Sequence, residues 1–545
     1  MKRRNCLQAI IFGITGVLIA VYPCIPKPLE GDKAKDKPNI IVIMADDMGF
    51  SDLGCYGSEI NTPNLDRLAD GGLRFTHFYN NAKCVPSRIS LMTGLYPQQI
   101  KSENMENSVN IVQVLKSAGY RMLMTGKNNG GIAGLPTEQG FDRFYGLNDG
   151  ACNHFNPGIK RPGENEPGRK YPSERRAWSI DGKVIQPYTP QNKDFYSTDA
   201  FTDCAIDYLN QYGKDDDPFF LYVSYTAPHF PLQAWPEDIA RYRGKYMIGW
   251  DVIRQKRYER LVKLGLIDKR WKLSTRDPNV PKWEDVKNKD SHDLEMAVYA
   301  AMIDRIDQGV GRILATVRQL DIEENTLVLF LSDNGSCAED YKAFNSTAPE
   351  IPPGPMESYR TLGVSWANAS NTPFRKYKWW NHEGGISTPL IAYWPRVIKD
   401  GGKITHQVGH IMDIMATCLD IAGIQYPSTH NGQMVQPLEG KSLVPIFQGT
   451  KRKGHQFLYW QFSSSYAIRK GKWKLVLAHP NPRAGIDYFN EADEFKQKAL
   501  KQRRWELYDM ESDRTEMNDL AGKHPEIVKQ MAQAWDEWNI QPDVN

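Results

Sequence analysis

The sequence is poor in cysteine and has no excess of charge of either sign. Eight cysteines occur among 545 residues, and they form no Cys-x-x-Cys pair and no zinc-type spacing. We therefore expect most of them to be buried thiols, with an occasional disulfide. The 68 basic and 65 acidic side chains leave a formal charge of +3, which gives no electrostatic argument for nucleic-acid binding. The sequence contains no internal repeats, and its length suits one large domain and a small one.

The apolar run at the N-terminus is short for a membrane span. Leu7–Tyr22 is mostly apolar and follows the basic Lys2–Arg4, a pattern typical of an export signal. We expect residues 1–24 to be this signal and 25–38 a polar linker, so that the protein is exported to the periplasm or cell surface of a bacterium. An uncleaved membrane anchor is the alternative, whereas lipidation at Cys24 fits poorly because a proline precedes it.

Four continuous apolar runs predict strands that are buried on both faces. They are Asn39–Ala45, Phe219–Tyr225, Thr326–Ser332 and Pro389–Trp394. Helical patterns lie between them, at Asn64–Asp70, Val109–Ala118, His292–Leu320 and His410–Ala422. This alternation indicates an α/β fold with a mostly parallel sheet flanked by helices, in which ligands bind at the carboxyl ends of the strands.

Three segments depart from this pattern. Asn153–Pro190 is rich in proline, glycine and charge and predicts a long loop. Trp235–Lys289 is highly charged and predicts a solvated helix and loop that cover one side of the pocket. Toward the C-terminus the pattern changes to a hairpin, a strand and a helix, at Tyr466–Val476, Trp505–Tyr508 and Pro525–Trp538. We expect a large catalytic domain over 39–450 and a small C-terminal α+β domain with an antiparallel sheet over 451–545.

Oxygen-donor side chains gather at two predicted strand ends. Asp46 and Asp47 follow the first strand, and Asp333 and Asn334 follow the third. Clustered carboxylates are costly to bury unless a cation lies among them, and ligands that are all oxygen favour Ca²⁺ or Mg²⁺ over Zn²⁺. Taken alone, each pair could equally be a helix cap or a turn.

The segment Cys84–Gly94 carries the most specific motif. Its Cys-x-Pro-Ser-Arg sequence, followed by an apolar run and Thr-Gly, resembles the signature of the type I, formylglycine-dependent sulfatases. Further stretches resemble sulfatase motifs in family order: Asp46–Gly54, Thr62–Ala69, Gly119–Lys127, Pro373–Lys378, Glu383–Gly385 and Trp505–Asp509. The chain looks most like the bacterial arylsulfatase-type branch. The resemblance implies an alkaline-phosphatase-like α/β fold and the hydrolysis of sulfate esters.

The resemblance also implies a modified nucleophile and a metal. A maturation enzyme would oxidise Cys84 to formylglycine (3-oxoalanine), and the hydrate of this aldehyde would attack sulfur. A divalent cation, usually Ca²⁺ with Mg²⁺ as the alternative, would bind residue 84 and the side chains of Asp46, Asp47, Asp333 and Asn334.

Four further residues would complete the implied machinery. Arg88 would hold the aldehyde hydrate through charge-assisted hydrogen bonds. Lys127 and Lys378 would bind sulfate oxygens as they gain charge in the transition state. His229 would protonate the leaving alcohol or bind the sulfate.

One position departs from the family pattern. The second sulfatase signature usually reads Gly-Lys-Trp-His, but here Lys127 is followed by two asparagines, the second of them Asn129. Asparagine forms hydrogen bonds but is not a base at neutral pH, so another residue, such as His154 or His382, would have to replace the missing imidazole. If nothing replaces it, the protein is a catalytically impaired, glycan-binding pseudo-sulfatase.

The residues after Lys378 are candidates to line the substrate pocket. They are Trp379, Trp380, Asn381 and His382, although the two tryptophans could equally pack against the sheet edge. The arylsulfatase-type branch includes exo-acting glycan sulfatases, some acting on 3-O-sulfated galactose, so the expected substrate is a sulfated carbohydrate or an aryl sulfate. A phosphodiesterase or phosphonate hydrolase of the same fold is the competing function, but the sequence lacks a histidine-rich second metal set.

Overall fold

The computed structural model describes residues 37–100, 106–128, 133–159, 178–339, 351–462, 465–477 and 504–539. Outside these ranges lie the predicted export signal, residues 25–36 of the predicted linker, and Asn129. Within them, no helix is both long enough and apolar enough to cross a membrane.

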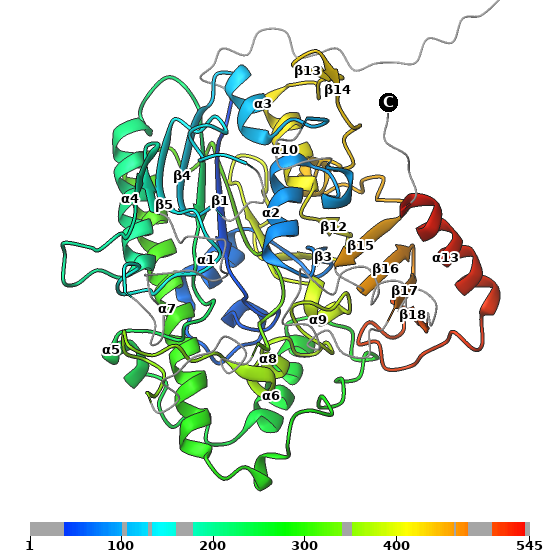
Figure 1. Cartoon of the computed structure of the whole chain (residues 1–545). Helices are drawn as coiled ribbons and strands as arrows, with labels where there is room; N and C mark the ends of the chain where they lie inside the picture. Colours follow the sequence, from blue (N-terminus) through cyan, green and yellow to red (C-terminus); the bar gives the residue numbers. More distant parts are fainter. Residues whose placement is uncertain are drawn as a thin grey trace, which may run out of the picture.

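A ten-stranded mixed sheet forms the centre of the molecule (Figure 1). The strand order is β11 (Lys403–Thr405), β2 (Leu73–Phe75), β10 (Leu390–Tyr393), β9 (Thr326–Ser332), β1 (Asn39–Ala45), β8 (Phe219–Ser224), β4 (Arg121–Lys127), β5 (Arg143–Leu147), β6 (Trp178–Ile180) and β7 (Lys183–Ile185). The strands from β9 to β5 pair in parallel, whereas β10, β6 and β7 run antiparallel to their neighbours. The predicted mostly parallel sheet is confirmed, and the carboxyl ends of β9, β1, β8 and β4 lie at one edge.

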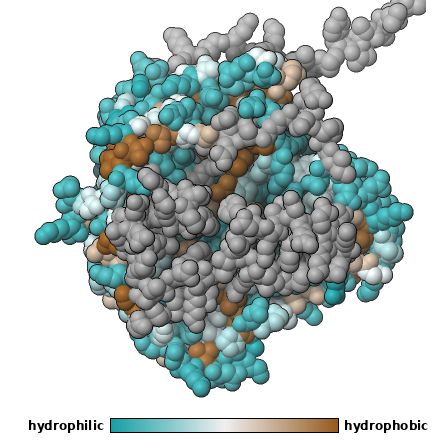
Figure 2. Space-filling view, in the orientation of Figure 1, coloured by the Kyte–Doolittle hydropathy of each residue, from teal (hydrophilic) through white to brown (hydrophobic). Residues whose placement is uncertain are grey.

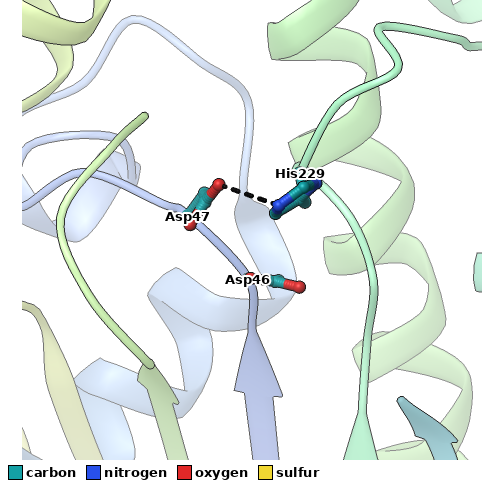
Figure 3. Close-up of side chains that lie close together, drawn as sticks. All are labelled: Asp46, Asp47 and His229. Carbon is teal, nitrogen blue, oxygen red and sulfur yellow. Dashed lines mark ion pairs between the residues drawn. The ribbon is translucent and has the colours of Figure 1, made fainter. Parts of the chain in front are cut away.

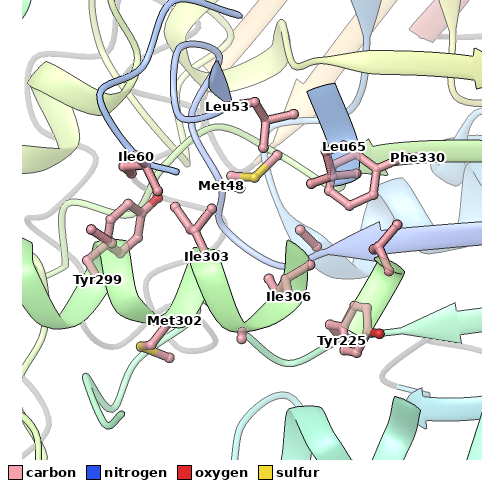
Figure 4. Close-up of a cluster of buried hydrophobic side chains, with 14 of the residues drawn as sticks. Met48, Leu53, Ile60, Leu65, Tyr225, Tyr299, Met302, Ile303, Ile306 and Phe330 are labelled. Atoms are coloured by element: carbon pink, nitrogen blue, oxygen red, sulfur yellow. The ribbon is translucent and has the colours of Figure 1, made fainter. Parts of the chain in front are cut away.

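Alternate side chains of β1 enter two hydrophobic clusters, one on each face of the sheet. Ile41 and Ile43 pack in the cluster with helices α1 (Pro63–Gly71), α4 (Ser197–Tyr212) and α7 (Lys289–Gln319). Ile40 and Val42 pack in the cluster with α2 (Cys84–Thr93), α3 (Ile111–Ser117) and α10 (Asp413–Ala422). Figure 4 shows part of the first cluster, with side chains of α7 against the segment that follows β1. Because helices cover both faces, the central strands are continuous apolar runs without alternation.

A second, four-stranded antiparallel sheet lies near the C-terminus (Figure 1). It contains β15 (Leu458–Phe462), β16 (Ser465–Lys470), β17 (Trp473–Leu477) and β18 (Trp505–Asp509), and α13 (Pro525–Asn539) packs on it. Buried tryptophans of the helix and the sheet, among them Trp535 and Trp460, share this small core. The predicted C-terminal α+β unit with its hairpin, last strand and helix is confirmed.

Shorter elements connect these parts. They are β3 (Phe78–Tyr79), β12 (Gly409–His410), β13 (Thr429–His430), β14 (Gln433–Met434), α5 (Pro236–Ala240), α6 (Trp250–Lys263), α8 (Gly363–Ser370), α9 (Glu383–Ile386) and α11 (Val444–Phe447). The coloured part of the face in Figure 2 is mainly hydrophilic, with hydrophobic side chains in small separate patches, as is usual when the large apolar residues lie in the core.

Two sequence predictions require correction. Asn153–Pro190 is not loop throughout, because its described part contains the hairpin of β6 and β7, which extends the large sheet. Trp235–Lys289 is not simply solvated, because α6 buries Trp250 and places the guanidinium of Arg257 in the interior between acidic partners. Charge in a sequence does not show whether an ionic side chain has a buried counter-ion.

Candidate active site

The predicted polar residues meet at the carboxyl edge of the parallel strands. Asp46 and Asp47 follow β1, Asp333 and Asn334 follow β9, Lys127 ends β4, and His229 lies in the loop after β8. Each of these side chains is at most 1% exposed. Since the four strands are neighbours, residues far apart in the sequence form one buried cluster.

The two adjacent aspartates each pair with a lysine. Lys127 Nζ forms a very short ion pair with Asp46 Oδ2, and Lys378 Nζ lies 2.7 Å from Asp47 Oδ2. Asn334 Nδ2 donates to Asp47 Oδ1 at 2.7 Å. The lysines with an implied role in sulfate binding therefore contact the carboxylates with an implied role in cation binding.

Arg88 connects the end of β9 to the same cluster. Its Nη2 lies 3.1 Å from Asp333 Oδ2 and 3.9 Å from Asp46 Oδ2. Its Nη1 donates to the Tyr222 hydroxyl at 3.0 Å and to Ser224 Oγ. The sequence analysis missed Tyr222 and Ser224, whose only signal is that they are two apart near the carboxyl end of β8 and so share a face of the sheet.

Burial and neighbouring charges shift the pKa values of the carboxyl groups in opposite directions. Burial opposes the ionisation of Asp46, but Lys127, Arg88 and Lys378 outweigh it and hold the pKa of Asp46 below its ordinary value. Burial, reinforced by the negative charge of Asp46, raises the pKa of Asp333 to about 7 despite the attraction of Arg88. The carboxylate of Asp333 is therefore not fully compensated by the described basic side chains.

His229 lies close enough to both aspartates to form a group of three side chains that could hold a metal ion (Figure 3). One ligand atom of each lies within 4.8 Å of the others, and His229 Nε2 is 3.5 Å from Asp47 Oδ2. His229 Nδ1 is 2.8 Å from the Phe230 carbonyl, which fixes the Nδ1–H tautomer of the neutral ring. The predicted ligand set contained no histidine, although His229 was predicted to act in the same site.

The buried oxygens of the cluster fit a hard divalent cation. Asp46 Oδ1 and Asn334 Oδ1 have no hydrogen-bond partner among the residues that the structure describes. A buried oxygen without a donor is costly, and ligation of a cation satisfies it. With the carboxylates of Asp47 and Asp333, these atoms make the kind of all-oxygen set that Ca²⁺ and Mg²⁺ prefer.

Cys84 is the first residue of α2 and is 2% exposed. Burial opposes the positive charge of Arg88 and of Lys378, but neighbouring groups outweigh it and raise the pKa of both. The main contributions come from Tyr222 and Asp333 for Arg88 and from Asp47 for Lys378, and Cys84 adds a smaller one to each. Ser87 closes the preceding loop, since its Oγ accepts from the Asn81 N–H at 3.0 Å and donates to the Asn81 carbonyl at 3.1 Å. Residue 84 is thereby held at the positive end of the helix dipole, beside the charged cluster.

The two tryptophans proposed for the substrate pocket differ in exposure. Trp379 is half-buried, and Lys83 Nζ lies 3.4 Å from the centroid of its ring. Trp379 Nε1 also donates to Glu339 Oε1 at 2.6 Å, and Lys83 pairs with the same carboxylate at 3.0 Å. Trp380 is buried. Trp379 thus belongs to a polar group directly beside the start of α2, while Trp380 has the burial of a packing residue.

Asn381 and His382 face the C-terminal sheet and are fully buried. Asn381 Nδ2 donates to the Ser465 carbonyl at 2.7 Å, and His382 Nε2 lies 3.0 Å from Glu506 Oε2. These contacts indicate a joint between the two sheets instead of the predicted substrate contacts. The contact of His382 Nε2 with Glu506 also argues against His382 as the base that replaces the missing imidazole at position 129.

His154 contacts the backbone of His229. Its Nδ1 lies 2.8 Å from Ser197 Oγ and its Nε2 lies 3.1 Å from the His229 carbonyl. Burial lowers the pKa of His154 to about 4. With both ring nitrogens engaged, His154 is a supporting residue and not the substitute base considered from the sequence.

The fold and this site together define a hydrolase with the alkaline-phosphatase-like α/β fold. Comparison with known proteins gives the family. The family model described as Sulfatase matches residues 38–424, and the model described as N-sulphoglucosamine sulphohydrolase, C-terminal, matches residues 376–541. The chain belongs to the sulfatase family and is a sulfuric ester hydrolase.

Curated relatives agree with this assignment, and solved structures agree with the fold. An uncharacterized sulfatase of Schizosaccharomyces pombe is 32% identical, with 92% of this chain and 93% of the relative covered. An arylsulfatase of Klebsiella aerogenes is 31% identical over 76% of this chain and 92% of its own. The crystal structure of Ps i-CgsB with k-i-k-neocarrahexaose has a TM-score of 0.64 at 24% identity, covering 92% of this chain and 93% of that one. A structure in complex with D-glucosamine-2-N,6-O-disulfate has a TM-score of 0.60 at 22% identity, covering 93% and 100%.

Proposed function

We propose that this sulfatase acts through a formylglycine hydrate derived from Cys84, assisted by a Ca²⁺ ion held by Asp46, Asp47, Asp333 and Asn334. The observation that carries the proposal is the buried cluster itself, in which three carboxylates and three basic side chains meet beside the first residue of α2. The buried oxygens of Asp46 and Asn334 that lack donors support the cation. A bound cation would neutralise the charge of the sulfate. The hydrate would supply one hydroxyl as the nucleophile and a second hydroxyl through which sulfate is released.

The residues of the chain then have distinct tasks. Arg88, held by Asp333 and by β8, donates hydrogen bonds to oxygens at position 84. Lys127 and Lys378 stabilise negative charge on the sulfate oxygens from fixed buried positions, at no cost of reorganisation. His229 keeps its Nδ1 proton on the Phe230 carbonyl, so it gives a proton to the leaving alcohol from Nε2 of the imidazolium form, in which both ring nitrogens carry a proton, and becomes the neutral Nδ1–H tautomer.

The proposed substrate is a sulfated carbohydrate, with 3-O-sulfated galactose or an aryl sulfate as specific possibilities to test. Support comes from the names of relatives and neighbours, which include N-acetylgalactosamine-6-sulfatase of Canis lupus familiaris, 28% identical over 84% of this chain. Maturation by a formylglycine-generating enzyme and export to the periplasm or cell surface, inferred from residues 1–24, complete the proposal.

The test is an activity assay on protein produced together with a maturation enzyme. Turnover is measured on nitrophenyl sulfate, nitrophenyl phosphate and a panel of sulfated sugars. The mass of the peptide that contains position 84 shows how much of Cys84 has been converted. We expect conversion of Cys84 to the aldehyde, turnover of sulfates and loss of turnover in Cys84→Ala, whereas Cys204→Ala in α4 keeps it. Turnover of phosphates alone would refute the proposal. Full conversion without any turnover would instead support the pseudo-sulfatase, and Asn129→His then tests whether the missing imidazole is the cause.

A further inference from the structure

Asp47 has an unusual backbone conformation for a residue with a side chain. Its φ is +66°, in the left-handed region that residues other than glycine adopt only when surrounding contacts hold them there. Its N–H donates to Asp333 Oδ1 at 3.2 Å. Its carbonyl accepts from the hydroxyl of Tyr299, on α7, at 3.1 Å. The backbone N–H and carbonyl of Asp47 are thus held from two directions, by Asp333 after β9 and by Tyr299 on α7.

The Tyr299 hydroxyl is shared with a second buried acid. It lies 2.8 Å from Asp52 Oδ2, and the same carboxylate oxygen accepts from the Gly49 N–H at 2.8 Å. Tyr299 is 1% exposed and Asp52 is fully buried. Figure 4 shows Tyr299 on α7 next to Ile60, in the segment that follows β1. One hydroxyl group thus joins the Asp47 carbonyl to the turn formed by the next residues of the chain.

Arg257 extends the chain of contacts to α6. Its Nη1 lies 2.6 Å from Asp52 Oδ1, while its Nε and Nη2 contact Glu59 at 2.9 and 2.8 Å. The guanidinium is fully buried between these two carboxylates. An arginine that binds two acids in fixed geometry restricts both, because its donors form a planar fork.

We infer that Tyr299, Asp52 and Arg257 are positioning residues that hold Asp47 in its left-handed conformation and so aim its carboxylate at the cation site. The inference rests on the proposed function, since it concerns the proposed Ca²⁺ ligand. The close packing of this loop agrees with it: a Cβ on Gly49 would lie 2.4 Å from the Ser370 carbonyl oxygen, so the backbone here lies directly against α8 with no room for a side chain. Partners that orient metal ligands change metal affinity or activity by roughly 10–100-fold when removed.

The experiment is calorimetric titration of Ca²⁺ into the chelator-treated full chain, with the unfolding temperature of the Ca²⁺-free protein as a second measurement. Tyr299→Phe removes the shared hydroxyl, and Tyr225→Phe is the matched control. Tyr225 is equally buried in the same hydrophobic cluster and loses a hydrogen bond to Thr202 at 2.8 Å, whereas Tyr299 loses its contacts with Asp47, with Asp52 and with Ser336 Oγ at 3.3 Å. We expect the dissociation constant of Ca²⁺ to rise at least tenfold in Tyr299→Phe and to be unchanged in Tyr225→Phe, with similar unfolding temperatures without Ca²⁺.

Arg257→Lys is the second test variant, because it keeps the charge but loses the fork between Asp52 and Glu59. We expect weaker Ca²⁺ binding here as well. Equal Ca²⁺ affinity in wild type, Tyr299→Phe and Arg257→Lys would overturn the inference while leaving the proposed function intact. Failure of the proposed function is seen separately, as a wild-type protein that binds no Ca²⁺ and turns over no sulfate ester.

Discussion

Lys378 Nζ lies 2.7 Å from Asp47 Oδ2, and neither side chain is more than 1% exposed. Lys127 and Asp46 repeat this pairing one residue earlier, directly after β1. The lysines proposed to bind sulfate are therefore held by the carboxylates proposed to bind the cation. Their charges interact at short range in a buried environment. Sulfate binding by the lysines and cation binding by the aspartates therefore depend on each other.

Replacing Lys378 with alanine tests this pairing. The change removes a preorganised positive charge where the sulfate oxygens gain charge, and we expect kcat for nitrophenyl sulfate to fall by about 10²–10³-fold. Lys376→Ala is the matched control, because Lys376 pairs with Asp277 at 3.1 Å and has no contact with the aspartates of the site. A similar loss in both variants would show that the effect comes from the loop and not from the charge.

Ca²⁺ is expected to raise the stability of the chelator-treated protein. A ligand that binds only the folded state stabilises it by about 2.7 kcal/mol when its concentration is 100 times its dissociation constant. The measurement is the free energy of unfolding in denaturant with Ca²⁺, with Mg²⁺ and with neither. Asn334→Ala, which removes one of the oxygens without a donor, should reduce the gain from Ca²⁺. If Ca²⁺ raised the free energy of unfolding equally in wild type and in Asn334→Ala, the ion would have to bind at another site.

Maturation of Cys84 is expected to require an unfolded chain. In the folded protein Cys84, Ser87 and Arg88 are at most 2% exposed, so an enzyme that reads the motif has no access to it. We expect a maturation enzyme to convert Cys84 in a peptide spanning the motif, or in denatured protein, but not in folded unmodified protein. Mass spectrometry of the peptide containing position 84 measures this directly. Efficient conversion of the folded chain would mean that α2 opens readily.

The sequence predicted those parts of the structure that depend on short segments. The apolar runs of β1, β8, β9 and β10 could be identified because a strand buried on both faces needs apolar residues throughout. The acids at the strand ends followed from the same argument. In contrast, β6 and β7 were missed because they have only three residues each, too few for a period-2 pattern.

The part of the site that could not be predicted depends on long-range pairing. Tyr299 lies in a helix whose apolar period it fits, and nothing local shows that its hydroxyl reaches a loop about 250 residues earlier in the chain. Arg257 looks like a surface charge until its two acidic partners are known. His382 was assigned to the substrate because it follows Lys378, but Glu506 of the C-terminal sheet is its partner.

A buried ionic group at the joint of the two sheets leads to a pH-dependent prediction. Glu383 is fully buried and contacts Lys474 at 2.8 Å and Arg514 at 3.0 Å. Burial opposes its ionisation, but Lys474 and Arg514 outweigh it and hold the pKa of Glu383 below the ordinary value of 4.5. Removing one partner of a buried ion pair costs about 3–5 kcal/mol, so we expect Glu383→Gln to lower the free energy of unfolding by this amount at pH 7.

The expected pH dependence follows from the direction of that shift. A carboxyl whose pKa is lower in the folded than in the unfolded state contributes stability above the unfolded pKa and loses it as the pH falls through the folded pKa. The difference in unfolding free energy between wild type and Glu383→Gln should therefore be constant above about pH 5 and narrow in stronger acid. Denaturant unfolding at several pH values measures it, with Glu237→Gln on the exposed surface as a control expected to change stability by less than about 0.5 kcal/mol. A difference that stays the same down to pH 3 would show that Glu383 stabilises the joint by its shape and hydrogen bonds and not by its charge.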